Sequence, residues 1–447
     1  MLLDRLRWTA YFALCSRGQA RYPFRPIGSI ARDRDARVRR MIRYAWRHVP
    51  YYRETMRRLE LTPSDITTAD ELRKLPILER EQLQKDPEYF LAQAERKREF
   101  VELSSSGSTG APVTVWHNLA AVFANAACGE RERSIVTRLL DRPVGYRMAV
   151  LATHDGAVYR IAELCRTRRW LPPGVPIRRR FFSIFDAPAE NAQRIREYRP
   201  ELVHGFGSYI EALFTYVRES GCPFVSPKAV TYTADGMSPA SRRLLAEEYG
   251  IPAFSIYQAS EAFKIGFECD RHYGHHLNVD LYPSYVVGSS GAPAPPGAEG
   301  DVVVSNLVNR ASVILNYRLG DVATLLPDPC PCGRSLPLLS FVEGRTDDWV
   351  TLPSGQRMHP HAFHAVLRAE KGVWRYQIVQ SGKGAFRLDL VVSQAVNRDS
   401  LERRVGRALG ERLGSDVSIE VRYVDALHRT EAGKTRWVLA DRKHTPG

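Results

Sequence analysis

Short apolar runs alternate with helical patterns through the middle of the chain, between about residues 145 and 345. The runs and the helical patterns that follow them are 147–153 then 158–166, 202–205 then 209–219, and 229–234 then a helix starting near Pro239. Alternation of this kind is typical of parallel βαβ units, because each strand is followed by a helix that crosses the sheet. We therefore predict a large α/β domain.

The flanking segments follow other patterns. Apolar residues recur at helical spacing in residues 35–60 until Pro50, and Thr68 can cap a short helix over 69–74. A helix rich in small residues is predicted over 118–140, and strands are predicted over 99–103, 301–306 and 311–317. The last hundred residues predict a compact α+β unit: helix 360–368, strands 373–380 and 386–392, helix 400–413 and strand 417–424.

These changes of pattern divide the chain into two domains. Residues 1–95 are expected to form an N-terminal helical segment of the large domain and residues 96–345 its main part, of mixed sheets and helices. Residues 346–447 are expected to form a small α+β C-terminal domain. A chain of 447 residues is too long for one core, which agrees with this division.

The charge is uneven. Residues 1–60 hold fifteen Arg and five acidic residues, out of a formal net charge of +14 for the whole chain. Such a segment could make weak contact with a membrane surface, but a solvated basic helix is the favoured explanation, since Arg is used throughout the chain. We find no nucleic-acid-binding module, no membrane-spanning run and no signal-peptide layout, and therefore expect a cytoplasmic protein.

Five short motifs carry candidate chemistry. They are SSSGSTGAP at 104–112, YQASEA at 257–262, YRLGD at 317–321, GRTDD at 344–348 and RTEAGK at 429–434. A Ser/Gly loop between a strand and a helix suits phosphate, a carboxylate can hold Mg²⁺ on phosphates, and a mobile lysine can meet a developing negative charge. Each motif alone is at least as well explained as a loop, a helix cap or a surface charge.

Together, in this order, the motifs resemble the signature of the adenylate-forming superfamily. The branch that the chain resembles most is that of the phenylacetate–CoA ligases and CapK-like proteins. RYAWRHVPYYRE at 43–54, LPILEREQL at 75–83 and the Cys-containing stretch 325–334 are also similar to this branch. The resemblance covers about residues 35–445 and implies ATP-dependent conversion of a carboxylic acid to acyl-AMP, followed by transfer to a thiol, with CoA as the expected acceptor.

The resemblance also implies roles for single residues. The phosphate loop would be Ser105, Ser106, Gly107, Ser108, Thr109 and Gly110. Asp235, Gly236 and Tyr257 would lie at adenine, Glu261 would hold Mg²⁺, and Asp321 and Arg345 would bind the ribose. Lys434 would bridge the carboxylate and the α-phosphate, and the small domain would swing as a lid about Asp347. Phe206, His204, Tyr209 and Tyr232 would lie in segments that line the acyl pocket.

Four positions depart from the family pattern. Ala111 replaces a frequent Lys, Gln258-Ala259-Ser260 replaces Gly-x-Thr before Glu261, Asp235 is shorter than the usual Glu, and Gly207 stands where Pro is common.

The cysteines point to a metal. Cys269, Cys330 and Cys332 could supply three thiolates, with His272, His275 or His276 as the fourth ligand of a closed, structural Zn²⁺ site. The family pattern favours His276. Three reduced thiols without a metal are the alternative.

The acceptor stays open from sequence. A carrier-protein thiol, an amine or a sugar hydroxyl are alternatives to CoA, in polysaccharide or secondary-metabolite synthesis. A non-enzymatic scaffold in envelope assembly is a further alternative, against which Lys434, Glu261 and Asp321 argue. A homodimer is expected from the resemblance alone.

Overall fold

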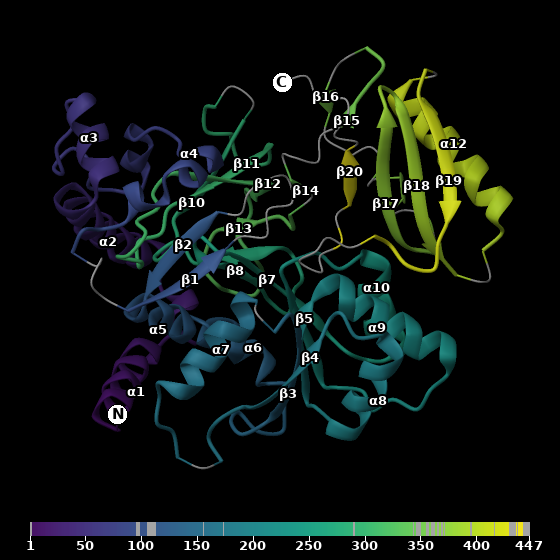
Figure 1. Cartoon of the computed structure of the whole chain (residues 1–447), viewed down its shortest axis with the longest axis horizontal. Helices are drawn as coiled ribbons and strands as arrows, with labels where there is room; N and C mark the ends of the chain where they lie inside the picture. Colours follow the sequence, from purple (N-terminus) through teal and green to yellow (C-terminus); the bar gives the residue numbers. More distant parts are fainter. Residues whose placement is uncertain are drawn as a thin grey trace.

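The computed structural model describes most of the chain. The described residues are 2–94, 99–104, 113–154, 156–172, 174–288, 291–342, 344–345, 350–354, 357–358, 363, 366–367, 370, 372–393, 396–414, 416–428, 435 and 437–440. N-terminal helices, drawn in purple, lie at one side of the molecule and the yellow-green C-terminal domain lies at the other, with the large sheet between them (Figure 1).

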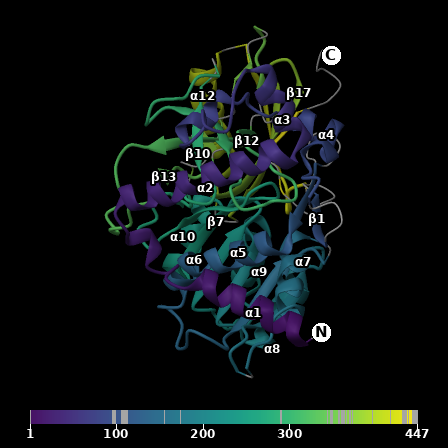
Figure 2. The same ribbon diagram turned by 90° about the vertical axis from the view of Figure 1, so that its left-hand side faces the viewer.

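Three α-helices open the chain: α1 (Leu2–Ser16), α2 (Ile27–His48) and α3 (Pro50–Arg58). The helix predicted from residue 35 begins earlier, and Pro50 ends α2 while starting α3, where a missing backbone N–H costs nothing. Figure 2 shows α1 lying along α5 (Leu119–Cys128). Short helices follow at Tyr22–Phe24, Asp70–Lys74, Arg80–Lys85 (α4) and Pro87–Phe90, the second of them tighter than the α-helix predicted there.

Five parallel strands form one half of the main sheet, in the order β7–β6–β5–β3–β4. Their bounds are β3 (Arg147–Ala152), β4 (Arg178–Ser183), β5 (Leu202–Phe206), β6 (Ala229–Thr233) and β7 (Ala253–Ala259). The crossover helices are α7 (Ala157–Thr167), α8 (Pro188–Tyr198), α9 (Gly207–Ser220) and α10 (Pro239–Arg243), which a π-helical turn at Leu244–Glu248 continues. The predicted βαβ alternation is confirmed.

The other half of the sheet is antiparallel. It contains β8 (Phe263–Glu268), β9 (His275–Leu277), β10 (Ser284–Val287), β11 (Glu299–Val304), β12 (Tyr317–Leu326), β13 (Leu338–Leu339) and β14 (Gly344–Arg345). A separate hairpin pairs β1 (Phe100–Ser104) with β2 (Thr114–Asn118).

Two predicted elements differ from the structure. The helix over 118–140 is divided at Gly129 into α5 and α6 (Glu130–Val136), because Gly129 caps α5 and Lys264 packs against it. The prediction of a strand over 311–317 is wrong, because this segment is buried but has no regular secondary structure before β12. Its backbone bonds to the N-terminal segment instead of a ladder, with Val313 N–H donating to the Phe90 carbonyl and Leu315 N–H to the Tyr52 hydroxyl.

The C-terminal segment has a core of its own, which includes Ile378, Leu388, Leu390, Val405 and Leu409. Its sheet has the order β19–β18–β17–β20, built from β17 (Val373–Gly382), β18 (Ala385–Val392), β19 (Ser418–Tyr423) and β20 (Val438–Ala440). Helix α12 (Arg398–Leu413) covers it, and β15 (Val350–Thr351) pairs with β16 (Arg357–Met358). Phe363, Val366 and Leu367, the described residues of the helix predicted over 360–368, are helical.

The predicted fold class, a large α/β domain followed by a small α+β domain, is confirmed. The domain boundary at 345–346 stays a prediction, since residues 346–349 lie outside the described residues. Within the part of the chain that the structure describes, no helix has the length and apolarity needed to cross a bilayer.

Candidate active site

The predicted site residues are described to different extents. Ser105, Ser106, Gly107, Ser108, Thr109 and Gly110 lie outside the described residues, as do Asp347 and Lys434. Only the backbone of Arg345 is described, and it pairs with Asp321 across β14 and β12. The remaining predicted residues have described side chains.

Tyr257 and Asp321 meet although 64 residues separate them. The Tyr257 hydroxyl donates a 2.8 Å hydrogen bond to Oδ2 of Asp321. Tyr257 is near the carboxyl end of β7 and Asp321 lies in β12, and both side chains line one large cavity. Because Asp321 lines the cavity, its carboxylate offers an acceptor for the hydroxyls of a diol there.

Glu261 lies in the turn after β7, four residues beyond Tyr257. It is buried, and its Oε1 accepts a 3.3 Å hydrogen bond from the Tyr317 hydroxyl. Its backbone carbonyl accepts from the Asn306 side chain, which fixes the turn. Because Glu261 also lines the cavity, its carboxylate fits the usual manner of Mg²⁺ binding, through one carboxylate together with substrate phosphates.

Asp235 and Gly236 form the turn between β6 and α10. Asp235 accepts hydrogen bonds from the backbone N–H of Ser208, at 3.1 Å, and from its hydroxyl. A Cβ at Gly207 would lie 2.6 Å from the Gly236 carbonyl oxygen, so only glycine permits this approach of α9 to the turn. The departure from the family's Pro at position 207 thus accompanies a close backbone contact.

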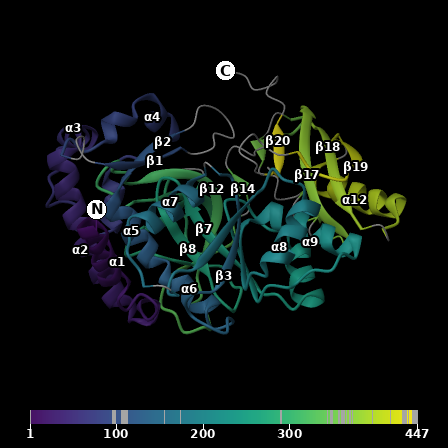
Figure 3. The same cartoon turned by 60° about the horizontal axis from the view of Figure 1, so that its bottom comes forward.

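The cavity lies between the two domains and has a volume of about 2380 Å³. Tyr376, His428, Thr435 and Trp437 of the small domain line it together with the turn at Gly236. A Cβ added at Gly236 would lie 3.8 Å from the Trp437 ring, so the two residues are neighbours across the cavity. Figure 3 shows β17 and β20 beside α9, on the side where the domains meet.

A buried ion pair joins the domains at this place. Nε of Arg375, in β17, lies 3.2 Å from Oε2 of Glu211, in α9, with side-chain exposures of 6% and 1%. Glu211 also accepts from the Ser238 backbone N–H. The sequence did not indicate this pair, since 164 residues separate its members and no local motif marks either.

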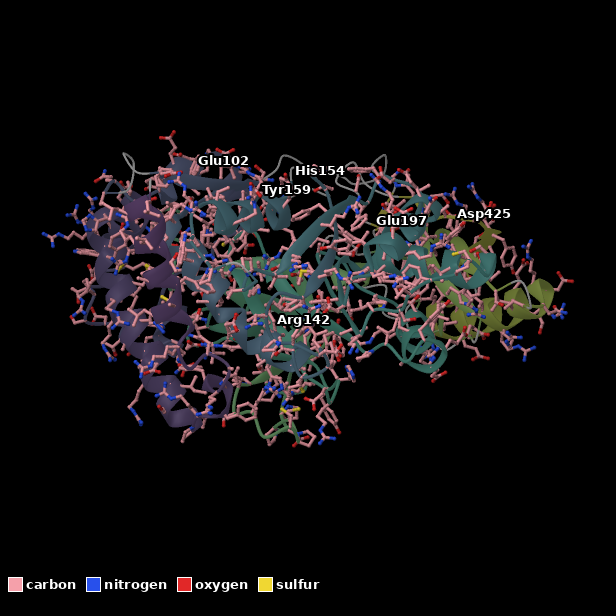
Figure 4. The ribbon with its side chains drawn as sticks, turned by 90° about the horizontal axis from the view of Figure 1, so that it is seen from below. Glu102, Arg142, His154, Tyr159, Glu197 and Asp425 are labelled. Atoms are coloured by element: carbon pink, nitrogen blue, oxygen red, sulfur yellow. The ribbon has the colours of Figure 1, made fainter. Side chains whose placement is uncertain are left out.

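The inner part of the cavity is bounded by parallel strands and α7. Of the four residues named for the acyl pocket, His204, Phe206 and Tyr232 line the cavity. Tyr209 is buried instead, with its hydroxyl donating to the Asp186 carbonyl at 2.7 Å. His154 and Tyr159 also line the cavity, and the centroids of their rings are 5.4 Å apart (Figure 4).

Cys269, His276, Cys330 and Cys332 come together outside this cavity. One ligand atom from each lies within 4.8 Å of all the others. Cys269 follows β8, His276 lies in β9, and the other two cysteines lie in the loop between β12 and β13. His272 and His275 have other partners: Glu268 and Ser255 respectively.

The donor atoms fit a tetrahedral zinc ion. Two thiolates at about 2.3 Å from Zn²⁺ lie roughly 3.8 Å apart, and Sγ of Cys269 and Cys330 are 3.7 Å apart. Sγ of Cys332 lies 3.3 Å from Nε2 of His276. Burial raises the pKa of Cys269 to about 12, so zinc binding would have to displace the proton of this thiol. Burial lowers the pKa of His276 to about 4, so its imidazole is neutral and ready to bind a metal.

Comparison with known sequences gives two kinds of relative. The family model described as the CapK C-terminal domain matches residues 352–441. A phenylacetate-coenzyme A ligase of Thermus thermophilus is 27% identical over 92% of this chain and 96% of its own length. The protein CapK of Staphylococcus aureus is 18% identical over 89% of this chain and 86% of its own length.

Comparison with solved structures agrees. A 2-hydroxyisobutyryl-CoA ligase in the postadenylation state, in complex with 2-HIB-AMP, matches with a TM-score of 0.75 and 20% identity, covering 94% of this chain and 91% of that one. The same ligase in the thioesterification state matches with a TM-score of 0.60, over 93% and 90% of the two chains.

The resemblance that the five motifs suggested is therefore confirmed: over about nine-tenths of its length the chain is similar to phenylacetate–CoA ligases, it has the fold of an adenylate-forming CoA ligase, and residues 352–441 match the CapK C-terminal domain.

Proposed function

We propose that the protein activates a carboxylic acid with ATP and transfers the acyl group to the thiol of CoA. In the first step a carboxylate oxygen forms a bond to the α-phosphorus of ATP, and the bond from that phosphorus to the oxygen of the leaving pyrophosphate breaks. In the second step the thiol attacks the acyl carbon, its proton passes to solvent or base, and AMP leaves. The observation that carries the proposal is the Tyr257–Asp321 pair, which shares one cavity with Glu261 and the Asp235–Gly236 turn.

Each residue has a task in this proposal. Tyr257 and the Asp235–Gly236 turn bind the adenine, and Asp321 with Arg345 binds the ribose hydroxyls. Glu261 binds Mg²⁺, which neutralises phosphate charge. The loop from Ser105 to Gly110 wraps the β- and γ-phosphates, and Lys434 stabilises the charge that develops at the α-phosphate. Thr435, directly after Lys434, lines the cavity, which supports a place for the lysine near it.

The four-residue cluster has a structural task. We propose that Cys269, His276, Cys330 and Cys332 hold one Zn²⁺ that ties the loop between β12 and β13 to the main sheet. ATP, CoA and the reduced state of these thiols are all provided by the cytoplasm, where we propose that the protein works. A homodimer and a weak membrane contact of the basic N-terminus remain predictions from the sequence.

One observation, the match of residues 352–441 to the CapK C-terminal domain, favours an acceptor other than CoA as a second candidate. A carrier-protein thiol, an amine or a sugar would then replace CoA in the second step. The first step is the same in either case.

The test is acid-dependent exchange of pyrophosphate into ATP without CoA, over a panel of aryl, aliphatic and amino acids. We expect exchange with one acid class. Lys434→Ala should lower its rate at least about 100-fold, because the lysine stabilises charge that develops in the transition state, and Asp321→Asn should raise the KM for ATP, because Asp321 binds the ribose hydroxyls. The control variants Lys383→Ala and Asp70→Asn change exposed residues of the same type and should leave exchange unchanged. Absence of both exchange and ATP binding in folded protein would refute the proposal and favour a scaffold.

A further inference from the structure

The cavity extends well beyond the residues proposed to bind the nucleotide. It has a volume of about 2380 Å³, and the proposed function places ATP, the acid and CoA at it. Tyr257, Glu261, Asp321 and the Asp235–Gly236 turn line the nucleotide end. The other end extends along the parallel strands as far as β4, the edge strand of the sheet.

The floor of this inner end is one face of three parallel strands, β4, β3 and β5. Arg179 of β4 pairs with Met148 of β3, which pairs with Leu202 of β5. Two residues further along, Val150 pairs with His204. Side chains two residues apart lie on the same face of a strand, and all five of these residues line the cavity.

The roof over this floor is mostly apolar. Ile161, Ala162 and Cys165 of α7 and Phe12 of α1 line the cavity there. Together with Met148 and the other aliphatic residues of the floor, they form an apolar passage between the nucleotide end and β4.

Most charged groups near the passage are already paired. Lys264 forms an ion pair with Glu132, and Arg133 with Glu130 at 2.8 Å. Arg169 donates a 2.9 Å hydrogen bond to the Cys165 carbonyl and lies over the Phe12 ring. The charges of Lys264 and Arg133 are therefore offset by carboxylates, and the Arg169 guanidinium is held by the Cys165 carbonyl and the Phe12 ring.

Arg179 is different. Among the residues that the structure describes, it has no carboxylate within ion-pair distance and no hydrogen-bond acceptor, and its side chain faces the open cavity. The surrounding protein still removes enough water to lower its pKa, an effect that Arg169 and Arg133 reinforce. The same field reaches His204, whose pKa falls to about 4 through burial and then through the charges of Lys264 and Arg179. An arginine remains charged throughout the accessible pH range.

We propose that the acid activated by this protein carries a second acidic group, which Arg179 binds at the far end of the cavity. The inference rests on the proposed function and adds the substrate class. From β7 to β4 is four strand spacings, or about 19 Å between backbones at about 4.8 Å each. The acid is thus elongated, with a reactive carboxylate at the nucleotide, an apolar body in the passage and an anionic group at Arg179.

The test uses matched acids: monocarboxylic acids, and α,ω-dicarboxylic acids or their aryl equivalents of the same length. The variants are Arg179→Met, which keeps length and removes charge, and Arg179→Lys. Arg180→Met is the matched control, since Arg180 is the next residue of β4 and points to the opposite face, toward Phe182 and Tyr198. Pyrophosphate exchange without CoA is measured for every pair, and melting temperature is measured for every variant.

We expect the dicarboxylic acid to have the higher kcat/KM, and Arg179→Met to lower it roughly 10- to 100-fold, the usual effect of losing a hydrogen bond to a charged group. Arg179→Lys should restore part of this, and exchange with the monocarboxylic acid should stay within about threefold. Exchange that prefers monocarboxylic acids and ignores Arg179 would overturn the inference and leave the proposed function intact. The complete reaction with CoA is measured as well. An Arg179→Met variant that only raises the KM for CoA would overturn the inference, because Arg179 would then bind the acceptor.

A binding measurement distinguishes failure of this inference from failure of the proposed function. Titration calorimetry of the dicarboxylic acid with the whole chain requires no adenylation. Binding that Arg179→Met weakens and Arg180→Met does not would support the inference even if exchange were absent. No binding at millimolar dicarboxylic acid would overturn it, whatever the exchange assay gives.

Discussion

The ion pair between Arg375 and Glu211 should hold the two domains in the arrangement that the structure shows. The arrangement superposes better on the postadenylation state of 2-hydroxyisobutyryl-CoA ligase than on its thioesterification state, with TM-scores of 0.75 and 0.60. The pair is buried and bridges β17 of the small domain and α9 of the large one. Replacing Arg375 by Met removes one partner and keeps the length of the side chain.

The magnitude follows from burial. Removing one member of a buried ion pair costs about 3–5 kcal/mol, because the other charge stays uncompensated. Two routes reduce that cost here. Burial already raises the pKa of Glu211, and without Arg375 the carboxyl can take up a proton. The small domain can also move away and admit water. We therefore expect the docked arrangement to lose about 1.4–2.8 kcal/mol, or 10- to 100-fold in the equilibrium constant between the docked and undocked arrangements.

The two half-reactions report this change separately. Pyrophosphate exchange measures adenylation, and release of AMP from preformed acyl-AMP with CoA measures transfer. We expect Arg375→Met to lower exchange by up to about 100-fold and to leave transfer within about threefold of the wild-type rate. Arg404→Met is the matched control, because Arg404 pairs at 2.7 Å with Glu370 inside the small domain.

A double-mutant cycle with Glu211→Gln completes the test. If the pair acts as a unit, the second substitution adds little to the first. The reasoning is refuted if exchange and transfer fall equally, if the single effects add fully, or if Arg404→Met has the same effect as Arg375→Met.

Three further predictions concern other parts of the chain. Burial lowers the pKa of His117 and of His204 to about 4, so the unfolded chain binds more protons below about pH 6.5, and stability should fall between pH 6.5 and 4 by up to about 1.4 kcal/mol per pH unit for each group. Urea unfolding at several pH values checks this, and His117→Gln should make the slope shallower. The cluster of Cys269 should hold one zinc per chain by elemental analysis, and Cys269→Ser should lower both zinc content and melting temperature; metal-free protein with an unchanged melting temperature would contradict it. Gly207→Ala should destabilise by about 1–3 kcal/mol, since its Cβ would lie 2.6 Å from the Gly236 carbonyl oxygen, whereas Gly410→Ala, in open space on α12, should be neutral or stabilising.

Much of the fold was predictable because the spacing of hydrophobic residues within a short segment indicates whether that segment forms a helix or a strand. The strand and helix pairs from β3 to α10 follow directly from alternating runs and helical spacing. The irregular structure of the segment 311–317 was not predictable from its sequence. Two of its backbone N–H groups bond to Phe90 and Tyr52, which are distant in sequence, and not to a neighbouring strand. Strand β20 is only three residues long and pairs parallel to β17, which no local pattern indicates.

The candidate site was predictable to the extent that motifs lie at strand ends. Tyr257, Glu261 and Asp321 each belong to a short motif, and the fold brings them to one cavity. The four residues proposed for zinc were named from residue type and family pattern, and the structure brings them within 4.8 Å. Arg179 was missed because a run of three arginines in an edge strand is normally a solvated face, and only the strand register shows that the middle one faces the cavity.

The residues that the sequence did not reveal share one property. Each contacts or faces elements that are far away in the sequence, and no local motif marks such a contact. Arg375 reaches another domain, and Arg179 faces a cavity whose opposite wall comes from α1 and α7. In the proposed function the motif residues bind the nucleotide, which every adenylate-forming reaction has in common. The acid in the relatives' names differs, and the domain arrangement differs between two states of one ligase, so we expect the residues that set them to lie outside the motifs. Substrate choice in this chain is therefore to be sought at Arg179 and along β3 to β5, not in the five motifs.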